Sequence, residues 1–216
     1  MRVVSVNVGL PRPVTYRGKT VMTGIWKHPV EGPVAIVGDN LVGDRQADLR
    51  VHGGRDKAVY GYPSEHYAWW REQLPEADLG WGAFGENLTV AGLLEDRVRV
   101  GDRFAVGAAE LVVTQPRTPC FKLGIKFGRP RIVKEFLRSE RSGFYFAVVR
   151  PGEIRAGDPI ALVHAPSDSM TITDLVRLGG AADADAAVLR RAAALPDLAA
   201  SWRRHFEERL AATDAS

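Results

Sequence analysis

The sequence predicts a mainly β fold with peripheral helices, followed by a small C-terminal domain of three helices. Two observations lead to this prediction: short β-rich runs fill residues 1–165, and such runs disappear after Pro166, where alanine becomes frequent. A chain of 216 residues with 45% hydrophobic content fits one globular unit of ordinary core size with a small appendage. We therefore expect a β domain over residues 1–165 and a helical domain over residues 166–216.

The β-rich runs are separated by Gly, Pro and Asp at short spacing. This pattern is typical of a β-barrel or a compact multi-stranded sheet. The predicted strands cover residues 2–8, 23–28, 33–38, 57–62, 87–90, 97–106, 110–115, 144–149 and 159–164.

Two helices are expected between the strands, over residues 64–74 and 131–139. Each follows a proline, the residue favoured at the first helical position. Apolar side chains recur at helical spacing in both segments and define a face for burial. The side chains expected on these faces are Tyr67, Trp70, Leu74, Ile132, Val133, Phe136 and Leu137.

The C-terminal segment predicts three short helices, over residues 172–178, 186–195 and 196–210. The last carries an apolar stripe of Leu198, Trp202, Phe206 and Leu210. Short helices are marginally stable alone. These helices should therefore pack on one another, on the β domain, or on a second chain, and the last arrangement would make a homodimer.

Composition limits the compartment and the class of partner. No apolar run reaches the roughly 18 residues that a membrane span needs, and the first residues, MRVVSVNVGLPRPV, read as a strand and not as a signal peptide. The single cysteine cannot form an internal disulfide. We therefore expect a cytoplasmic protein without a membrane partner.

The only cysteine, Cys120, lies in the basic stretch QPRTPCFKL. Most lone cysteines are small buried hydrophobes. Here Pro116 and Pro119 exclude a regular strand or helix through the site, and Arg117 and Lys122 would stabilise a thiolate by opposite charge. This setting favours a reactive thiolate or a metal ligand, and the residues alone leave both open.

The stretch VHGGRDKAV, residues 51–59, is a second candidate site. The pair Gly53 and Gly54 allows a backbone to approach a ligand, and Lys57 adds positive charge for a phosphate. The alternative is a hairpin turn with Asp56 as a capping residue. On its own, His52 is more typical of a structural residue than of a catalytic one.

Two further stretches contain polar residues that suit a ligand. Glu86 and Asn87 in FGENLTV would contact a polar ligand, or Asn87 would close a turn through its own backbone. Asp44, Gln46 and Asp48 alternate along residues 44–48, which is more typical of a solvated strand edge than of a metal site.

Several segments occur in the order in which they occur in the MOSC domain, the C-terminal domain of molybdenum-cofactor sulfurases, and resemble its YiiM-like subgroup. They are TGIWKHPV, VGDRQADLRVHGGRDKAVYGYPSEHY, FGENLTV, VGDRF and QPRTPCFKL. The resemblance covers roughly residues 1–165, and the C-terminal helices resemble the small helical domain of the same subgroup.

The resemblance implies a β-barrel-like fold that binds a molybdenum pyranopterin cofactor, with Cys120 as the ligand to molybdenum. Related enzymes reduce N-hydroxylated compounds, including hydroxylaminopurine base analogues, to amines. This reaction detoxifies them and uses electrons from a separate reductase. Residues expected to shape the site or move protons are His52, Asp56 and Glu86. Those expected to hold the cofactor are Gly53, Gly54, Lys57, Asn87, Arg117 and Lys122.

Two other functions compete with this interpretation. A sulfur carrier or cofactor-handling protein would use the same basic surroundings to activate a persulfide on Cys120. A nucleic-acid-binding barrel would use residues 115–140, which contain seven Lys or Arg and two acids. The net charge of +3 and the few aromatic residues in that segment disfavour nucleic acid.

Overall fold

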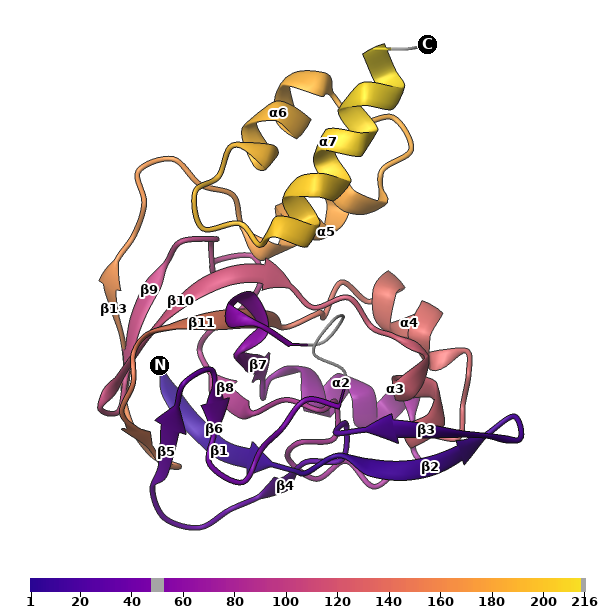
Figure 1. Ribbon diagram of the computed structural model, residues 1–216, viewed down its shortest axis with the longest axis vertical. Coiled ribbons are helices and arrows are strands. Elements are labelled where there is room, and N and C mark those ends of the chain that lie inside the picture. Colours follow the sequence, from indigo (N-terminus) through magenta and orange to yellow (C-terminus); the bar gives the residue numbers. More distant parts are fainter. Residues whose placement is uncertain (48–52, 215–216) are drawn as a thin grey trace.

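The main sheet has eight strands, and a computed structural model describes it within residues 1–47 and 53–214 (Figure 1). Its strand order is β13-β9-β10-β11-β7-β8-β1-β4, and every pair is antiparallel except β7 with β8. The strands are β1 (Arg2–Val8), β4 (His28–Pro29), β7 (Val59–Pro63), β8 (Leu88–Ala91), β9 (Arg103–Val106), β10 (Ala109–Pro116), β11 (Phe144–Arg150) and β13 (Ile160–His164).

The sheet does not close into a barrel, which corrects the barrel expected from the strand spacing. Its edges are β13 and β4. An isolated bridge between Arg2 and Pro159 and a few backbone hydrogen bonds, such as the Ile160 amide to the Met1 carbonyl, join the start of β1 to the chain around the start of β13. Two smaller sheets flank it. One is the hairpin of β2 (Arg12–Tyr16) and β3 (Lys19–Thr23), and the other contains β5 (Val34–Val37), β6 (Asn40–Leu41) and β12 (Glu153–Ile154).

The helices form two groups (Figure 1). Helices α2, α3 and α4 pack around one aromatic core, and α5 to α7 lie together above β10 at the other end of the molecule. The short helix η1 packs on β11. The bounds of all these helices are η1 (Arg55–Lys57), α2 (His66–Gln73), α3 (Phe121–Lys126), α4 (Ile132–Arg138), α5 (Ile172–Gly180), α6 (Ala186–Ala193) and α7 (Ala200–Asp214). The predicted C-terminal three-helix region is therefore confirmed, and it packs on the β region of the same chain.

Helix α5 begins where its sequence supplies a reciprocal cap. The Thr171 hydroxyl accepts a hydrogen bond from the Asp174 amide, and the Asp174 carboxylate accepts one from the Thr171 amide. The buried face of α5 joins the same core as the sheet: Leu175 and Phe206 belong to one apolar cluster with Val113. The core thus continues from the sheet into the C-terminal helices.

A second core is built from aromatic side chains and positions α2, α3 and α4. Phe136 stacks on Trp70 with ring centroids 5.7 Å apart, and Phe84 lies 4.8 Å from Tyr62. The Trp70 indole donates to the Tyr62 hydroxyl at 2.7 Å, so this buried polar pair is satisfied. Aromatic pairs of this kind stabilise by about 0.5–1.5 kcal/mol beyond burial.

Three sequence predictions are wrong for identifiable reasons. Residues 24–27 are not a strand, because the chain passes so close to another segment that a Cβ on Gly24 would lie 2.6 Å from the Arg45 carbonyl. Residues 97–102 form turns and a single isolated bridge from Arg99 to Thr171, and not a strand, because Gly101 has φ +85° and Asp102 closes a turn onto the Arg99 amide. Leu137 is 48% exposed, although Phe136 beside it is buried.

Within residues 1–47 and 53–214, no helix combines the length and the apolar character that crossing a bilayer requires.

Candidate functional site

Cys120 lies in a short irregular segment between β10, which ends at Pro116, and α3, which begins at Phe121. Its backbone is extended, with φ −119° and ψ 172°, and its carbonyl accepts the Leu123 amide at 3.0 Å. The thiol is partly exposed. The predicted loop is present over residues 117–120 and holds the thiol at the edge of a cavity. Pro116 does not exclude a strand, because it is the last residue of β10 and pairs with Phe144.

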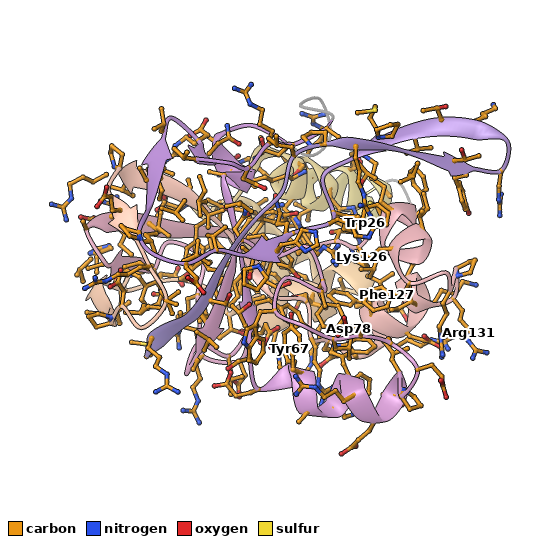
Figure 2. The ribbon with its side chains drawn as sticks, turned by 90° about the horizontal axis from the view of Figure 1, so that it is seen from below. Trp26, Tyr67, Asp78, Lys126, Phe127 and Arg131 are labelled. Carbon is orange, nitrogen blue, oxygen red and sulfur yellow. The ribbon has the colours of Figure 1, made fainter. Side chains whose placement is uncertain are left out.

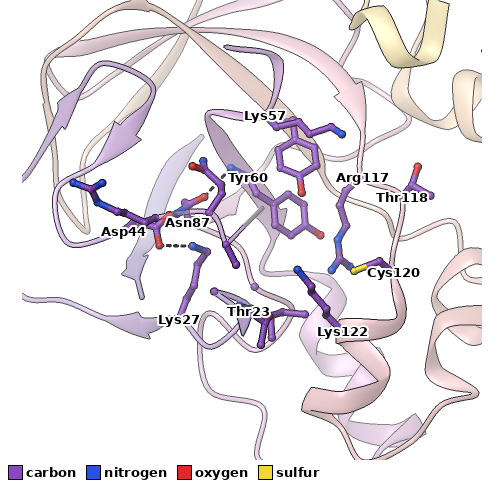
Figure 3. A pocket seen from close by; sticks show the side chains of 17 residues that line it. Thr23, Lys27, Asp44, Lys57, Tyr60, Asn87, Arg117, Thr118, Cys120 and Lys122 are labelled. Carbon is purple, nitrogen blue, oxygen red and sulfur yellow. Dashed lines mark hydrogen bonds and ion pairs between the residues drawn. The ribbon is translucent and has the colours of Figure 1, made fainter. Parts of the chain in front are cut away.

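This cavity, which we call the cationic cavity, has a volume of about 100 Å³ and carries five basic side chains and one acid (Figure 3). The basic residues are Lys27, Arg45, Lys57, Arg117 and Lys122, and the acid is Asp44. In Figure 3 the sulfur of Cys120 lies beside the guanidinium of Arg117. Such an excess of cations around a small cavity suits an anionic group such as a phosphate.

Asp44 holds one side of the cationic cavity together. Its carboxylate pairs with Lys27 and accepts the Gly9 amide and the Asn87 side-chain amide, both at 2.9 Å. Burial lowers the pKa of Lys27, and the attraction of Asp44 opposes that shift. Asp44 is 4% exposed, so the expectation of a solvated edge is wrong at this residue. Asp48 lies outside the described residues.

Arg117 is buried beneath Cys120 with part of its guanidinium unsatisfied. Its central carbon lies 5.3 Å from the Tyr60 ring centre and 4.9 Å from that of Phe136. Its Nη1 has no hydrogen-bond partner within residues 1–47 and 53–214. Because a buried donor without a partner is costly, a hydrogen-bond acceptor bound in the cavity would stabilise this residue.

Tyr60 and Tyr145 form a paired wall that the sequence analysis missed. They are direct partners in the β7–β11 ladder, with ring centroids 5.1 Å apart, and both line the cationic cavity. Burial raises the pKa of both tyrosines, which keeps their hydroxyls protonated. The sequence FYF, residues 144–146, could have indicated the position of Tyr145. In a strand, alternation places Tyr145 on the face opposite Phe144 and Phe146.

The structure brings together only part of the predicted site. Lys57, Asn87, Arg117, Cys120 and Lys122 line the cationic cavity. Burial lowers the pKa of Lys57, and Asp56 opposes that shift.

Glu86 and Asp56 lie outside the cavity lining and serve local structure. The Glu86 carboxylate is fully buried and accepts from the amides of Gly82 and Phe84 and from the hydroxyls of Tyr67 and Thr89. Every oxygen of that carboxylate is therefore engaged by the protein, which corrects the expectation that Glu86 faces a ligand.

Asp56 binds the helical region instead of the cavity. Its carboxylate accepts the Ala200 amide at the start of α7, at 3.4 Å. Gly54 has φ +89° and begins the η1 turn, and neither it nor Gly53 lines the cavity. His52 lies outside the described residues.

Family models match two parts of the chain. The MOSC domain matches residues 48–161, and the YiiM-like 3-alpha helix domain matches residues 170–213. The first match spans the main-sheet strands from β7 to β11 and the start of β13, whereas β1 and β4 precede it. The second match spans α5, α6 and nearly all of α7.

Individual relatives extend this similarity to nearly the whole chain. Protein YiiM of Escherichia coli (strain K12) is 36% identical over 189 residues, which cover 87% of this chain and 84% of that protein. A protein named Reductase from Gibberella moniliformis (strain M3125 / FGSC 7600) is 35% identical over 182 residues, 83% of this chain but 32% of that protein. The crystal structure of YiiM from Geobacillus stearothermophilus has a TM-score of 0.80 at 38% identity, with 97% of this chain and 98% of that chain covered.

Proposed function

The chain belongs to the MOSC family and is YiiM-like, and from this premise we propose that it is a molybdenum-cofactor-dependent reductase of N-hydroxylated compounds. The single observation that carries the proposal is the placement of the only thiol at the edge of a cavity with five cations and one acid. The fungal relative named Reductase supports an oxidoreductase. We place the reaction in the cytoplasm, where a lone thiol stays reduced.

The residues present fit a molybdenum pyranopterin cofactor. Its phosphate is an anion, and Arg117 offers a buried Nη1 without a partner among the described residues, with Lys27, Lys57 and Lys122 around the same space. Cys120 would give a thiolate to the metal. Among residues 1–47 and 53–214 no cluster of three or more His, Cys, Asp or Glu could hold a metal ion, and a metal carried by a cofactor needs fewer ligands from the chain.

The proposed reaction converts R–NHOH, two electrons and two protons to R–NH2 and water. The N–O bond breaks, an N–H bond forms, and the oxygen leaves as water. The cofactor would supply the oxygen-atom transfer chemistry, and a separate electron-transfer protein would supply the electrons. The chain would orient the substrate and hold a proton at the Tyr145 hydroxyl, which lines the cavity beside Cys120.

The test compares the wild type with Cys120→Ser, both produced in a molybdate-fed host that loads other molybdenum enzymes. We expect stoichiometric molybdenum by plasma mass spectrometry and N-hydroxyl reduction with a chemical electron donor in the wild type. Both should be lost in Cys120→Ser while the circular dichroism spectrum is kept. Thr118→Ala is the matched control, because Thr118 lines the same cavity but offers no thiolate.

Two results would contradict the proposal. One is full activity in Cys120→Ser, which would remove the thiol from the reaction. The other is a wild-type protein without molybdenum whose intact mass shows one additional sulfur on Cys120. That result would instead support the sulfur-carrier function.

A further inference from the structure

Cys120 also borders a second and larger cavity, on the side that faces the C-terminal helices. This space, which we call the apolar cavity, has a volume of about 670 Å³. Cys120, Arg117 and Tyr145 line both cavities, so the thiol lies on the border between them. The rest of the wall includes Pro119, Phe136, Leu137, Gly179, Trp202 and His205.

Contacts of the C-terminal helical region with the main sheet and with the loop after α4 hold this wall in place. Arg177 of α5 pairs with Glu140 at 2.8 Å, and the Ala199 amide donates to the Thr114 carbonyl at 3.2 Å. At the start of α7, the Ser201 hydroxyl donates to the Gln115 side chain at 3.3 Å. Since the helices also share a core with the sheet, the cavity exists before any ligand binds.

Trp202 owes its position to a glycine on the neighbouring helix. A Cβ on Gly179 would lie 2.9 Å from Cζ3 and 3.2 Å from Cη2 of the Trp202 indole. Contacts of that length require the ring to move. Gly180 also lines the cavity, yet a Cβ there would meet nothing within 4 Å. Of these two adjacent glycines, only Gly179 would displace Trp202 if it were replaced by alanine.

We propose that α5 and α7 form the substrate-selecting wall of this enzyme, and that Trp202, held by Gly179, is its specificity-determining side chain. The ligand is a flat, uncharged aromatic or heteroaromatic compound with its N-hydroxyl group directed toward Cys120. This inference rests on the proposed reductase function, and it adds the place of the substrate and the residues that choose it.

The chemistry of the wall supports this class of ligand. About 670 Å³ lies within the range of cavities that hold small organic ligands. Trp202 is only partly buried and offers an aromatic ring to the cavity, on which a flat ring stacks favourably. Phe136 contributes buried apolar surface to the same wall. The two cations that line the apolar cavity, Lys57 and Arg117, also line the cationic cavity. The acid in this lining, Glu140, is paired with Arg177. The imidazole of His205 offers one polar contact to a ring heteroatom.

The test measures binding of three probes to the full chain by calorimetry: phenylhydroxylamine, N-cyclohexylhydroxylamine and N-methylhydroxylamine. The first two are similar in size, and only the first is flat. We expect phenylhydroxylamine to bind most tightly, and Gly179→Ala to raise its Kd about tenfold, the upper range for one aromatic contact. Gly180→Ala, the matched control, should change the Kd less than Gly179→Ala, because its added methyl group would not displace Trp202. Trp202→Leu should act in the same direction as Gly179→Ala.

Equal affinity for the flat and non-flat probes, or equal effects of the two glycine variants, would overturn the proposal. A second measurement separates it from the reductase proposal, because binding needs no molybdenum. In cofactor-loaded protein, Gly179→Ala should raise the KM for phenylhydroxylamine and leave kcat and molybdenum content unchanged. Selective binding without any reduction would contradict the reductase function alone, whereas reduction with unchanged KM in Gly179→Ala would contradict only the substrate wall.

Discussion

The two cavities that meet at Cys120 differ in charge, size and origin. The cationic cavity is small, has five basic residues to one acid, and takes its side chains from the β region and the loops around it. The apolar cavity is several times larger, and α5 and α7 complete it. The difference suggests that one thiol serves two separate tasks, with the β region holding an anionic group and the helices selecting a substrate.

The largest effect should be on stability and should come from removing Asp44, the acid that lines the cationic cavity. In Asp44→Ala, Lys27 stays buried without its carboxylate, since the two side chains are only 9% and 2% exposed. Breaking a buried ion pair on one side costs about 3–5 kcal/mol. We expect the free energy of unfolding in urea to fall by that amount.

The double variant Lys27→Met/Asp44→Ala provides the control for this result. It leaves no unpaired charge, so part of the lost stability should return. If Asp44→Ala and the double variant were equally unstable, the loss would come from the Gly9 and Asn87 hydrogen bonds and not from the ion pair.

A smaller effect is expected at the border of the two cavities. Arg117→Met keeps an apolar side chain against Tyr60 and Phe136 but removes the unsatisfied guanidinium. Losing a hydrogen bond to a charged group costs about 1.5–3 kcal/mol, so the Kd for inorganic phosphate should rise about 10- to 100-fold in calorimetry. Arg141→Met is a matched control, because Arg141 also lies over a ring, 4.2 Å from Trp69, but lines neither cavity. Similar phosphate binding in both variants would show that Arg117 does not hold the anion.

The smallest effect concerns Lys126, which lines neither of these cavities. Figure 2 labels this residue together with its neighbour Phe127. Its ammonium donates to the carbonyls of Ile25 and Gly82. Burial lowers its pKa from 10.5 to about 8; Glu86 opposes this shift, and the cations Arg117 and Lys27 add to it. Between pH 8 and 10.5 the folded chain therefore binds fewer protons than the unfolded chain, and stability should rise with pH.

The measurement compares the wild type with Lys126→Met by urea unfolding at pH 8 and pH 9.5. One proton contributes about 1.4 kcal/mol per pH unit, so the wild type should gain about 1–2 kcal/mol relative to the variant. Because Lys27 and Lys57 titrate in both proteins, the difference isolates Lys126. Parallel pH profiles would mean that Lys126 keeps an ordinary pKa in the folded chain.

The sequence predicted elements whose signals are local. Helix α2 follows from the spacing of Tyr67 and Trp70 after a proline, and both side chains are buried. The loop at Cys120 agrees with Pro119, whereas Pro116 still pairs in β10. The open sheet did not follow, because edge pairing depends on how distant strands meet, as at Arg2 and Pro159.

The candidate site shows the same limit. Lys27 and Asp44 are an ion pair across 17 positions, and Tyr60 meets Tyr145 through the register of two strands. Neither contact has a local pattern. At Glu86 the local motif predicted a ligand contact that the structure does not bear out. Backbone amides and side-chain hydroxyls of the protein already donate to both oxygens of its carboxylate. The domain boundary near Pro166 stays a prediction, and the core itself continues across it.

The wall contributed by α5 and α7 has a consequence for how this protein can evolve. Gly180, Ser201 and His205 border the apolar cavity yet are exposed, and none belongs to a buried core. Substitutions at such positions usually change stability by less than about 0.5 kcal/mol. In the proposed substrate wall, single mutations at these positions would change which compounds are accepted at little cost in stability, and they would leave Cys120 and the cations around it in place.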